Sequence, residues 1–229
     1  MRSVKMRPDV AAEMRARVEA VVAANKAAGN VEVQISGRGF SVHEDVFNPT
    51  IAPSGLVGMG FSSLPWCSEK VVVDLGAGCG AFSILMALNG ARRVISTDLM
   101  AAPIDNIRAN VARYGLERAI EVRQGDGLDS LTNSDLIDVI YCDFPFLDYR
   151  KPTTDLEAAY FDMGLNSIRK LIREFSSDRY ANSELYICGT PAANAFAEEL
   201  HAHPKLNCTP SLEISNGWLS LELWKVTHL

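Results

Sequence analysis

An aspartate followed by three closely spaced glycines is the part of the sequence whose residue types most clearly suggest a ligand site. Asp74 lies near the end of the apolar run 71–75, and the residues that follow at alternate positions are Gly76, Gly78 and Gly80. Such a run is typical of a buried parallel strand, and glycines let the next turn bring backbone close to a ligand. In the dinucleotide fingerprint the third glycine comes one residue later, and a carboxylate here would repel pyrophosphate. The pattern favours a nucleoside with a positively charged end over NAD or FAD.

Two further acids follow strand-like segments and are candidates for the same site. Asp98 comes after the segment 93–97, and Asp126 stands between two glycines after the segment 120–124. The carboxyl ends of parallel strands meet at one edge of a sheet, so both acids are expected near Asp74. A carboxylate at this edge can accept hydrogen bonds from both hydroxyls of a ribose. The alternative interpretations are a helix cap at Asp98 and a simple turn at Asp126.

The stretch V-V-D-L-G-A-G-C-G at residues 72–80 resembles the first motif of the Rossmann-like S-adenosylmethionine-dependent methyltransferases. The resemblance implies that S-adenosyl-L-methionine is the cofactor and that its methionine end lies beside Asp74 and the glycine loop. It also implies that Asp98 binds the ribose and that Asp126 meets the adenine amino group. The residues expected to bind the cofactor are Asp74, Gly76, Ala77, Gly78, Gly80, Asp98, Leu99, Asp126 and Gly127.

A second motif, Asp143-Phe144-Pro145-Phe146, follows the fourth strand-like segment and bears on the methyl acceptor. It resembles the N/D-P-P-F/Y motif of methyltransferases that modify nitrogen on planar groups, among them exocyclic amines of nucleobases and the side-chain amide of glutamine. An acid and a backbone carbonyl can accept the two N–H bonds of such a group while an aromatic ring covers its face. The resemblance implies catalytic roles for Asp143, Pro145 and Phe146, whereas Phe144 stands where the first proline is usual. The alternative is an ordinary strand exit with an aspartate cap.

Two partial matches favour small-domain methyltransferases of the ribosomal-RNA and release-factor type without identifying the subfamily. Residues 45–49, with Ser54-Gly55-Leu56, resemble the V-F-x-P loop that precedes the first motif, and residues 160–165 keep part of a Gly-Gly-x-Asp-Gly-like turn. The substrate pocket is expected to include Phe47, Phe144 and Tyr149. At Phe47 and Tyr149 an aromatic residue is more often a packing residue, which is the alternative for both.

These residues together predict N-methylation of a planar amino or amide nitrogen in a nucleobase, a protein glutamine or a small metabolite. O-methylation or another N-methylation of a metabolite is an alternative. A non-catalytic S-adenosylmethionine-binding partner subunit is another, because the changed residue Phe144 would permit it. The glycine spacing and Asp74 argue against a nicotinamide oxidoreductase. The expected partner is the methyl acceptor.

Composition is that of a globular protein, with 229 residues, 48% of them hydrophobic and 22% charged. A net charge of −6 makes an extended nucleic-acid surface unexpected. No apolar run approaches membrane-spanning length, the first residues do not resemble a secretory signal, and the five cysteines lack C-x-x-C spacing. A cytoplasmic protein with no membrane association is therefore expected. His201 and His203 would not share a helix face, so no metal site is predicted.

From residue 71 onward strand-like and helix-like segments alternate, which is typical of a doubly wound α/β fold with a parallel sheet. Strands are expected at 71–75, 93–97, 120–124, 136–142 and 184–188, and helices at 80–89, 101–114, 128–131 and 155–175. Two more strands, 206–214 and 218–226, flank an Asn-Gly turn that favours an antiparallel hairpin. This resembles the seven-stranded methyltransferase sheet with strand order 3-2-1-4-5-7-6.

An N-terminal extension is expected before this sheet. Residues 8–28 predict an amphipathic helix, and residues 31–35 and 40–47 predict the two strands of a small hairpin. The apolar stripe of the helix consists of Val10, Met14, Val18, Val21 and Val22. The helix could cap the acceptor pocket or form a dimer contact. The predicted organisation is an extension of residues 1–39 and a methyltransferase domain of residues 40–229.

Overall fold

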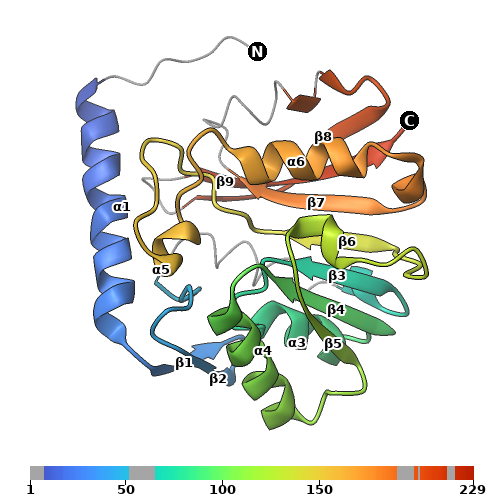
Figure 1. The fold of residues 1–229 in the computed structure, drawn as a ribbon, viewed down its shortest axis with the longest axis horizontal. Coiled ribbons are helices and arrows are strands. Elements are labelled where there is room, and N and C mark those ends of the chain that lie inside the picture. Colours follow the sequence, from blue (N-terminus) through green and yellow to red (C-terminus); the bar gives the residue numbers. More distant parts are fainter. Residues whose placement is uncertain (1–7, 52–64, 190–198, 201, 216–219) are drawn as a thin grey trace.

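The computed structural model describes residues 8–51, 65–189, 199–200, 202–215 and 220–229 (Figure 1). A seven-stranded sheet forms its centre, and helix α1 (Pro8–Ala28) stands to one side of it. A separate two-stranded hairpin of β1 (Val31–Ile35) and β2 (Arg38–Val42) follows α1. The Asn-Gly turn expected between the last two strands lies outside the described residues.

The large sheet has the predicted strand order. Its strands are β3 (Val71–Leu75), β4 (Arg93–Asp98), β5 (Ile120–Gln124), β6 (Val139–Cys142), β7 (Glu184–Gly189), β8 (Leu206–Ser215) and β9 (Ser220–His228). The helices are α3 (Ala81–Leu88), α4 (Ala101–Tyr114), α5 (Asp155–Ala158) and α6 (Asn166–Phe175), with single 3-10 turns at Pro65–Cys67, Gly127–Ser130 and Asp178–Tyr180. The order β5-β4-β3-β6-β7-β9-β8 is 3-2-1-4-5-7-6 when counted from β3, and β9 is antiparallel to both neighbours. The predicted fold class is confirmed.

Alternate residues of β3 point to opposite faces of the sheet and so divide the core in two. Val72 packs in the cluster beneath α3 and α4, whereas Val73 and Leu75 pack in the cluster beneath α6. All residues of β3 are buried because helices cover both faces and β4 and β6 flank the strand. The same alternation places Asp74 on the α3 side, one residue before the end of the strand.

The single helix expected over residues 155–175 is wrong, because the chain leaves the helix after α5 and enters a new one at α6. Gly164 and Leu165 have φ values of 91° and 53°, which an α-helix cannot contain. The Asp162 carboxylate accepts the N–H of Ser167 at 2.7 Å in the first turn of α6. The interruption lets the segment between the two helices turn toward α1 (Figure 1).

Two strands are shorter than expected. β6 begins at Val139 rather than at residue 136, since Leu136 is 80% exposed and precedes the strand. β2 ends at Val42, because the chain turns there and the N–H of Val46 donates to the carbonyl of His43 at 3.1 Å. The segment 45–49 is therefore a loop and not part of the hairpin.

Two buried asparagines of α4 hold the β1–β2 hairpin against the large sheet. The Asn106 side chain donates to the carbonyl of Ser41 at 2.9 Å and accepts the N–H of His43 at 2.9 Å. The Asn110 side chain accepts the N–H of Ser41 at 3.0 Å and donates to the carbonyl of Cys79 at 2.8 Å. One helix therefore fixes the positions of both the hairpin and the glycine loop.

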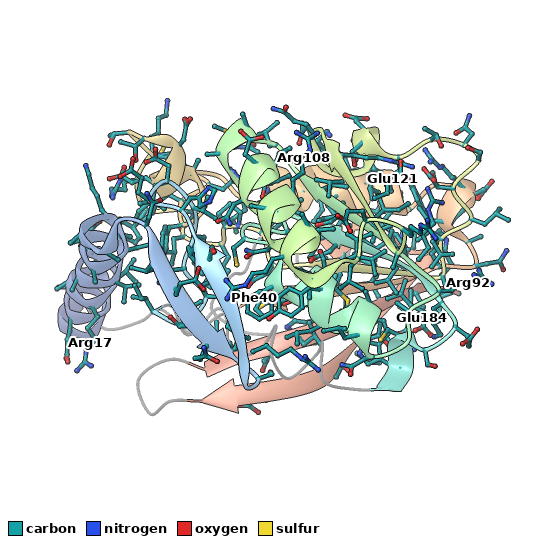
Figure 2. All side chains as sticks on the ribbon, turned by 90° about the horizontal axis from the view of Figure 1, so that it is seen from below. Arg17, Phe40, Arg92, Arg108, Glu121 and Glu184 are labelled. Atoms are coloured by element: carbon teal, nitrogen blue, oxygen red, sulfur yellow. The ribbon has the colours of Figure 1, made fainter. Side chains whose placement is uncertain are left out.

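Phe40 shows how closely the β1–β2 hairpin packs on the large sheet and its helices. It is fully buried and stacks on Tyr114 of α4 with ring centroids 5.3 Å apart, whereas Arg108 of the same helix points outward (Figure 2). The predicted boundary between residues 39 and 40 lies inside β2. The division into two units stays a prediction.

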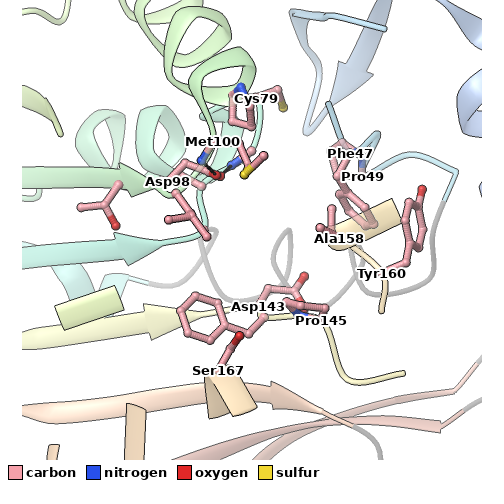
Figure 3. Close-up of a pocket in the computed structure, with 18 of the residues that line it drawn as sticks. Phe47, Pro49, Cys79, Asp98, Met100, Asp143, Pro145, Ala158, Tyr160 and Ser167 are labelled. Atoms are coloured by element: carbon pink, nitrogen blue, oxygen red, sulfur yellow. Dashed lines mark hydrogen bonds between the residues drawn. The ribbon is translucent and has the colours of Figure 1, made fainter. Parts of the chain in front are cut away.

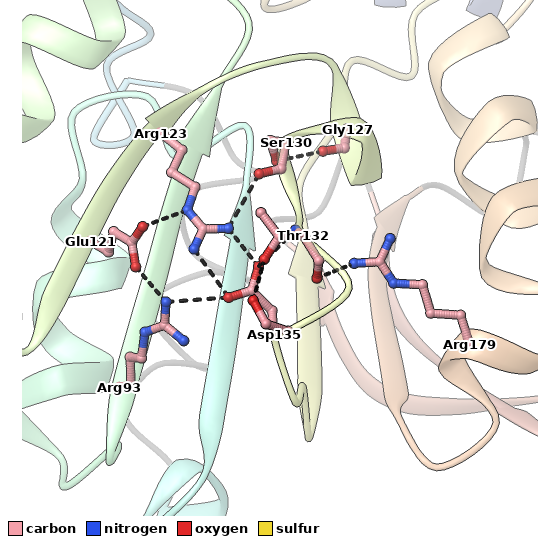
Figure 4. Close-up of polar contacts among 9 residues, drawn as sticks. Arg93, Glu121, Arg123, Gly127, Ser130, Thr132, Asp135 and Arg179 are labelled. Atoms are coloured by element: carbon pink, nitrogen blue, oxygen red, sulfur yellow. Dashed lines mark hydrogen bonds and ion pairs between the residues drawn. The ribbon is translucent and has the colours of Figure 1, made fainter.

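A group of charged residues joins β4 and β5 to the loop before β6 (Figure 4). The Asp135 side chain is 3% exposed and accepts hydrogen bonds from Arg123 at 2.6 and 3.0 Å and from Arg93 at 3.2 Å. Glu121 contacts both arginines from the other side. The Arg123 guanidinium, above all, holds the pKa of Asp135 well below its ordinary value despite burial.

Removing the Asp135 carboxylate should destabilise the fold, because two guanidinium groups lose a buried partner. We expect Asp135→Ala to lower the free energy of unfolding by about 3–5 kcal/mol in urea denaturation at pH 7. The matched control is Asp105→Ala, which removes an ion pair with Arg108 between exposed side chains and should cost less than about 1 kcal/mol. Equal losses in the two variants would contradict this role of Asp135.

Candidate active site

A cavity of about 220 Å³ opens at the carboxyl ends of the parallel strands (Figure 3). Its walls come from the loops after β3, β4, β5 and β6, together with α1, the segment 45–49 and α5. The predicted site residues that line it are Phe47, Asp74, Gly76, Ala77, Gly78, Asp98, Leu99, Asp126, Gly127, Asp143, Phe144, Pro145 and Phe146. The structure thus brings together all the predicted site residues except Gly80 and Tyr149, which lie outside the lining.

All three glycines of the loop have a backbone conformation that favours glycine, and at two of them a side chain would also meet neighbouring residues. Gly76, Gly78 and Gly80 have φ values of 70°, 58° and 77°. A Cβ at Gly76 would come within 3.2 Å of the Phe144 ring, and one at Gly80 within 3.1 Å of Ile107 on α4. Gly76 and Gly78 line the cavity, whereas Gly80 serves the packing of the loop on α4.

Most of the loop N–H groups that could meet an anion are already used within the chain. The N–H of Ala77 donates to the carbonyl of Thr97 at 2.9 Å, and that of Gly80 donates to the carbonyl of Ala77 at 2.8 Å. The N–H of Gly78 donates to the Asp98 carboxylate at 3.1 Å. The loop therefore offers a ligand backbone that it can approach closely, and few N–H groups that are free to donate.

Asp74 is a carboxylate in the protein interior, with 1% of its surface exposed. It accepts a hydrogen bond from the Ser83 hydroxyl at 2.5 Å, and Ser83 lies 2.7 Å from the Ser96 hydroxyl. Burial raises the pKa of Asp74 to about 7, and the nearby Asp143 and Asp98 carboxylates add to the rise, while Ser83 opposes it. The site thus holds a carboxylate that changes charge near neutral pH, and a cation beside it would favour the charged form.

Asp98 has the bonds of a helix cap and also faces the cavity. One carboxylate oxygen accepts the N–H of Met100 at 3.1 Å at the start of α4, and the other accepts the N–H of Gly78. Burial raises the pKa of Asp98, although these hydrogen bonds act in the opposite direction. Within the chain Asp98 therefore connects the glycine loop to α4, and its role toward a ribose stays a prediction.

Asp126 and Leu99 lie on the β4 and β5 side of the cavity. Leu99 is 57% exposed, so an apolar side chain is available there to a ligand. Asp126 already has a partner, because its carboxylate lies 3.2 Å from the Lys170 amine, which also pairs with Asp129 and Glu174. Burial alone would lower the pKa of Lys170, but these carboxylates raise it overall. This pairing has no local signal in the sequence, because Lys170 is distant in the chain, on α6.

Asp143 follows β6 and lines the cavity beside two buried groups, Tyr141 and Cys188. Burial raises the pKa of Tyr141 and of Cys188 well above their ordinary values. The Asp143 carboxylate raises both further, and a hydrogen bond from the Cys188 thiol contributes to this. Both groups stay protonated at neutral pH, so neither Tyr141 nor Cys188 places a charge beside Asp143.

Phe144, the residue that departs from the expected motif, has a packing partner of its own. Its ring lies against Gly76, so the loop after β6 contacts the glycine loop directly. Phe146 is half-buried against both halves of the core. With Pro145 between them, the two rings form a stiff wall of the cavity, and their role toward an acceptor stays a prediction.

A further wall of the cavity is formed by α1 and the residues around α5. Val18 and Val21 of α1 line the cavity together with Phe47 and Tyr160, whose rings are 5.1 Å apart. Of the two roles considered for the N-terminal helix, a cap over the pocket is the one seen within this chain, and a dimer contact stays a prediction. The apolar stripe through Val18 and Val21 was the signal for this wall.

Tyr149, expected in the substrate pocket, lies behind its wall. The hydroxyl donates to the Glu19 carboxylate of α1 at 3.1 Å, and the ring meets Phe161 edge-on with centroids 5.3 Å apart. These contacts favour the alternative interpretation of Tyr149 as a packing residue.

The described residues contain no group of three or more His, Cys, Asp and Glu side chains arranged to hold a metal ion. His203 Nε2 lies 3.5 Å from Glu199 Oε1, and His201 lies outside the described residues. Among the described helices, none has the length and apolar character needed to cross a membrane.

Comparison with known proteins supports the predicted family resemblance. Residues 65–142 match the family model of a methyltransferase domain. Over 124 residues the chain is 30% identical to the release factor glutamine methyltransferase of Xylella fastidiosa (strain 9a5c), a match that covers 52% of this chain and 44% of that protein. The chain therefore spans less than half the length of this curated relative.

Solved structures share the fold at lower identity. The hMettl16 catalytic domain, in complex with the MAT2A 3′UTR hairpin 1, has a TM-score of 0.65 and 17% identity over 83% of this chain and 75% of that one. Sp1610 of Streptococcus pneumoniae, in complex with S-adenosyl-L-methionine, has a TM-score of 0.56 and 18% identity over 76% of this chain and 71% of that one. This likeness confirms the Rossmann-like methyltransferase fold. The resemblance of residues 143–146 to the N/D-P-P-F/Y motif stays a prediction.

The raised pKa of Asp74 predicts that stability falls as the pH rises toward neutral. The folded protein holds this proton more tightly than the unfolded chain does, so the stabilisation is fully present below the ordinary pKa of 3.8 and is lost as the pH rises to about 7. The whole change corresponds to about 4 kcal/mol.

Urea denaturation of the wild type and of Asp74→Asn between pH 4 and pH 8 measures this effect. Because asparagine cannot ionise, the free energy of unfolding of the wild type should fall by about 4 kcal/mol relative to the variant over this range. Parallel pH profiles would show that Asp74 does not titrate as described.

Proposed function

We propose that this chain, which has the sheet of the Rossmann-like methyltransferases, transfers a methyl group from S-adenosyl-L-methionine to a planar amino or amide nitrogen. One observation carries the proposal: Asp143 lines the same cavity as the glycine loop and the carboxylates expected to hold the cofactor. An acceptor and a cofactor bound there would share one enclosed space. The match to a relative named as a glutamine methyltransferase supports an amide-type nitrogen.

The carboxylates, open backbone and apolar side chain that line the cavity support this choice of cofactor. Asp74 is a buried carboxylate suited to an ammonium group, and the Asp98 carboxylate faces the cavity where ribose hydroxyls are expected. The backbone at Gly78 is open to the cavity, because a Cβ there would meet no protein atom within 4 Å, and its positive φ favours glycine. Exposed Leu99 offers an apolar surface to an adenine ring.

Bound S-adenosyl-L-methionine supplies a methyl group already activated on a sulfonium. The protein then has to orient the acceptor, which is where most of the rate gain arises. Asp143 would accept an N–H of the acceptor nitrogen, and the rings of Phe144 and Phe146 would cover its planar face. As the nitrogen–carbon bond forms and the sulfur–carbon bond breaks, Asp143 offsets the positive charge on the nitrogen and can accept the proton that it loses. A cytoplasmic location is part of this proposal.

Two alanine variants separate cofactor binding from transfer. Asp143→Ala should slow transfer of tritiated methyl groups by about 10²–10³-fold and leave cofactor affinity in calorimetry nearly unchanged. Asp98→Ala should instead weaken cofactor binding by about 10–100-fold, because it removes hydrogen bonds to a charged group. Asp105→Ala, on the exposed side of α4, is the control for both measurements.

The outcomes distinguish the remaining alternatives. Full turnover by Asp143→Ala would exclude the nitrogen-site assignment. Tight cofactor binding by the wild type with no methylated product would favour a non-catalytic binding subunit, and label on oxygen would favour O-methylation.

Cofactor affinity should also depend on the charge of Asp74. An ammonium group favours the ionised carboxylate, so binding must release the proton that Asp74 holds below its pKa of about 7. We expect the dissociation constant to be about tenfold larger at pH 6 than at pH 8. Calorimetry in two buffers of different ionisation enthalpy measures the released proton. Asp74→Asn should bind more weakly and lose the pH dependence, and an unchanged dependence would refute this role.

A further inference from the structure

One buried side chain, Asn25 of α1, holds together the segments that cover the acceptor side of the cavity. It is 2% exposed and donates to the carbonyl of Val46 at 3.2 Å. Its oxygen accepts the N–H of Asn48 at 2.8 Å and the hydroxyl of Tyr160 at 2.6 Å. We call α1, the segment 45–49 and residues 155–160 the roof, because all three line the cavity and meet at Asn25.

A second group of contacts fixes the roof from outside the cavity. Arg150 donates to the Glu19 carboxylate of α1 at 2.8 and 3.0 Å and to Glu157 of α5 at 2.8 Å. Its guanidinium lies 3.8 Å from the centroid of the Phe161 ring. The hydrogen bonds from Arg150 lower the pKa of Glu19 and of Glu157. Hydrogen bonds and ion pairs therefore fix the roof to the rest of the fold.

The charged side chains that line the cavity in the described part of the chain all have one sign. They are Asp45, Asp74, Asp98, Asp126, Asp143 and Asp155. The cations Lys170 and Arg150 lie behind the wall and are paired with carboxylates.

Such a cavity disfavours a phosphorylated acceptor. A nucleic acid binds through cations that neutralise its phosphates, and a phosphate inside a carboxylate-lined space would be repelled without a compensating partner. The apolar surface of the roof, formed by Val18, Val21, Phe47 and Tyr160, suits a planar or apolar body instead. The fold itself does not set the acceptor, since a protein with the same sheet has been solved with an RNA hairpin.

Building on the proposed methyl transfer, we propose that α1 is the selecting element of the site. The roofed compartment takes a small, non-phosphorylated amine or amide whose body packs under Val18 and Val21 and whose nitrogen meets Asp143. Asn25 is a positioning residue, because its hydrogen bonds hold α1, the segment 45–49 and Tyr160 together over the part of the cavity where this acceptor binds.

The first arm of the test identifies the acceptor class. Wild-type protein, shown by calorimetry to bind S-adenosyl-L-methionine, is incubated with the tritiated cofactor and a cell extract that is then separated into RNA, protein and small molecules. Label should appear in small molecules whose chromatographic position is unchanged by phosphatase. Label in RNA, in protein or in phosphatase-sensitive compounds would overturn the inference while leaving methyl transfer established. A lack of label in every fraction would instead refute the proposed function, and the inference with it.

The second arm of the test places a larger side chain on α1 so that it occupies the space under the roof. Val21→Trp should reduce transfer at least about tenfold while the cofactor dissociation constant stays within about twofold. Ala23→Trp, which adds the same group at an exposed position of the same helix, should change neither. Val18→Phe, a smaller addition on the cavity side, provides the same test if Val21→Trp does not fold.

A third variant addresses the positioning role. Asn25→Leu should raise KM for the labelled acceptor more than it lowers kcat, because the roof loses its bonds but the reacting groups remain. Unimpaired transfer by both cavity-side variants, or an Asn25→Leu effect confined to cofactor affinity, would show that α1 does not select the acceptor.

Discussion

The burial of the Asp74 carboxylate at the end of β3 is the constraint on which the rest of the site depends. A charge in this position costs free energy unless hydrogen bonds or a cation compensate it, and Ser83 supplies only part of that compensation. Asp98 and Asp143 on the neighbouring strands are directed toward the same space and raise the cost further. The protein therefore brings carboxylates together where a cationic ligand would offset the cost of their charge.

Contacts around the glycine loop connect this group of carboxylates to α4 and to the β1–β2 hairpin. The loop can lie close to α4 because Gly80 has no side chain to meet Ile107, and Asn110 of that helix bonds the loop and the hairpin at once. The hairpin in turn follows directly on α1, whose valines close the cavity. Packing, hydrogen bonds and the continuous chain between α1 and the hairpin thus join the cofactor side of the site to the acceptor side.

Patterns of neighbouring residues in the sequence predicted the strands and most of the helices. Buried parallel strands such as β3 have a continuous apolar signature, so the strands of the sheet and their order followed from sequence and resemblance. The break between α5 and α6 could not be predicted in this way. The positive φ values of Gly164 and Leu165 arise from the path of the chain and not from a strong local signal. In the site, too, contacts between residues distant in the sequence could not be predicted. Tyr149 donates a hydrogen bond to Glu19, and Asp126 forms an ion pair with Lys170.

The bond between Asn25 and Tyr160 spans 135 positions of sequence, whereas Asp74 and Ser83 are only nine apart. Contacts of such different range form at different stages, because closing a long loop costs more chain entropy than closing a short one. During synthesis from the N-terminus, Asn25 lacks its Tyr160 partner until residue 160 has been made, whereas Ser83 follows Asp74 within nine residues. The hydrogen bonds at the centre of the roof therefore depend on a segment made much later than the residues that bond the Asp74 carboxylate.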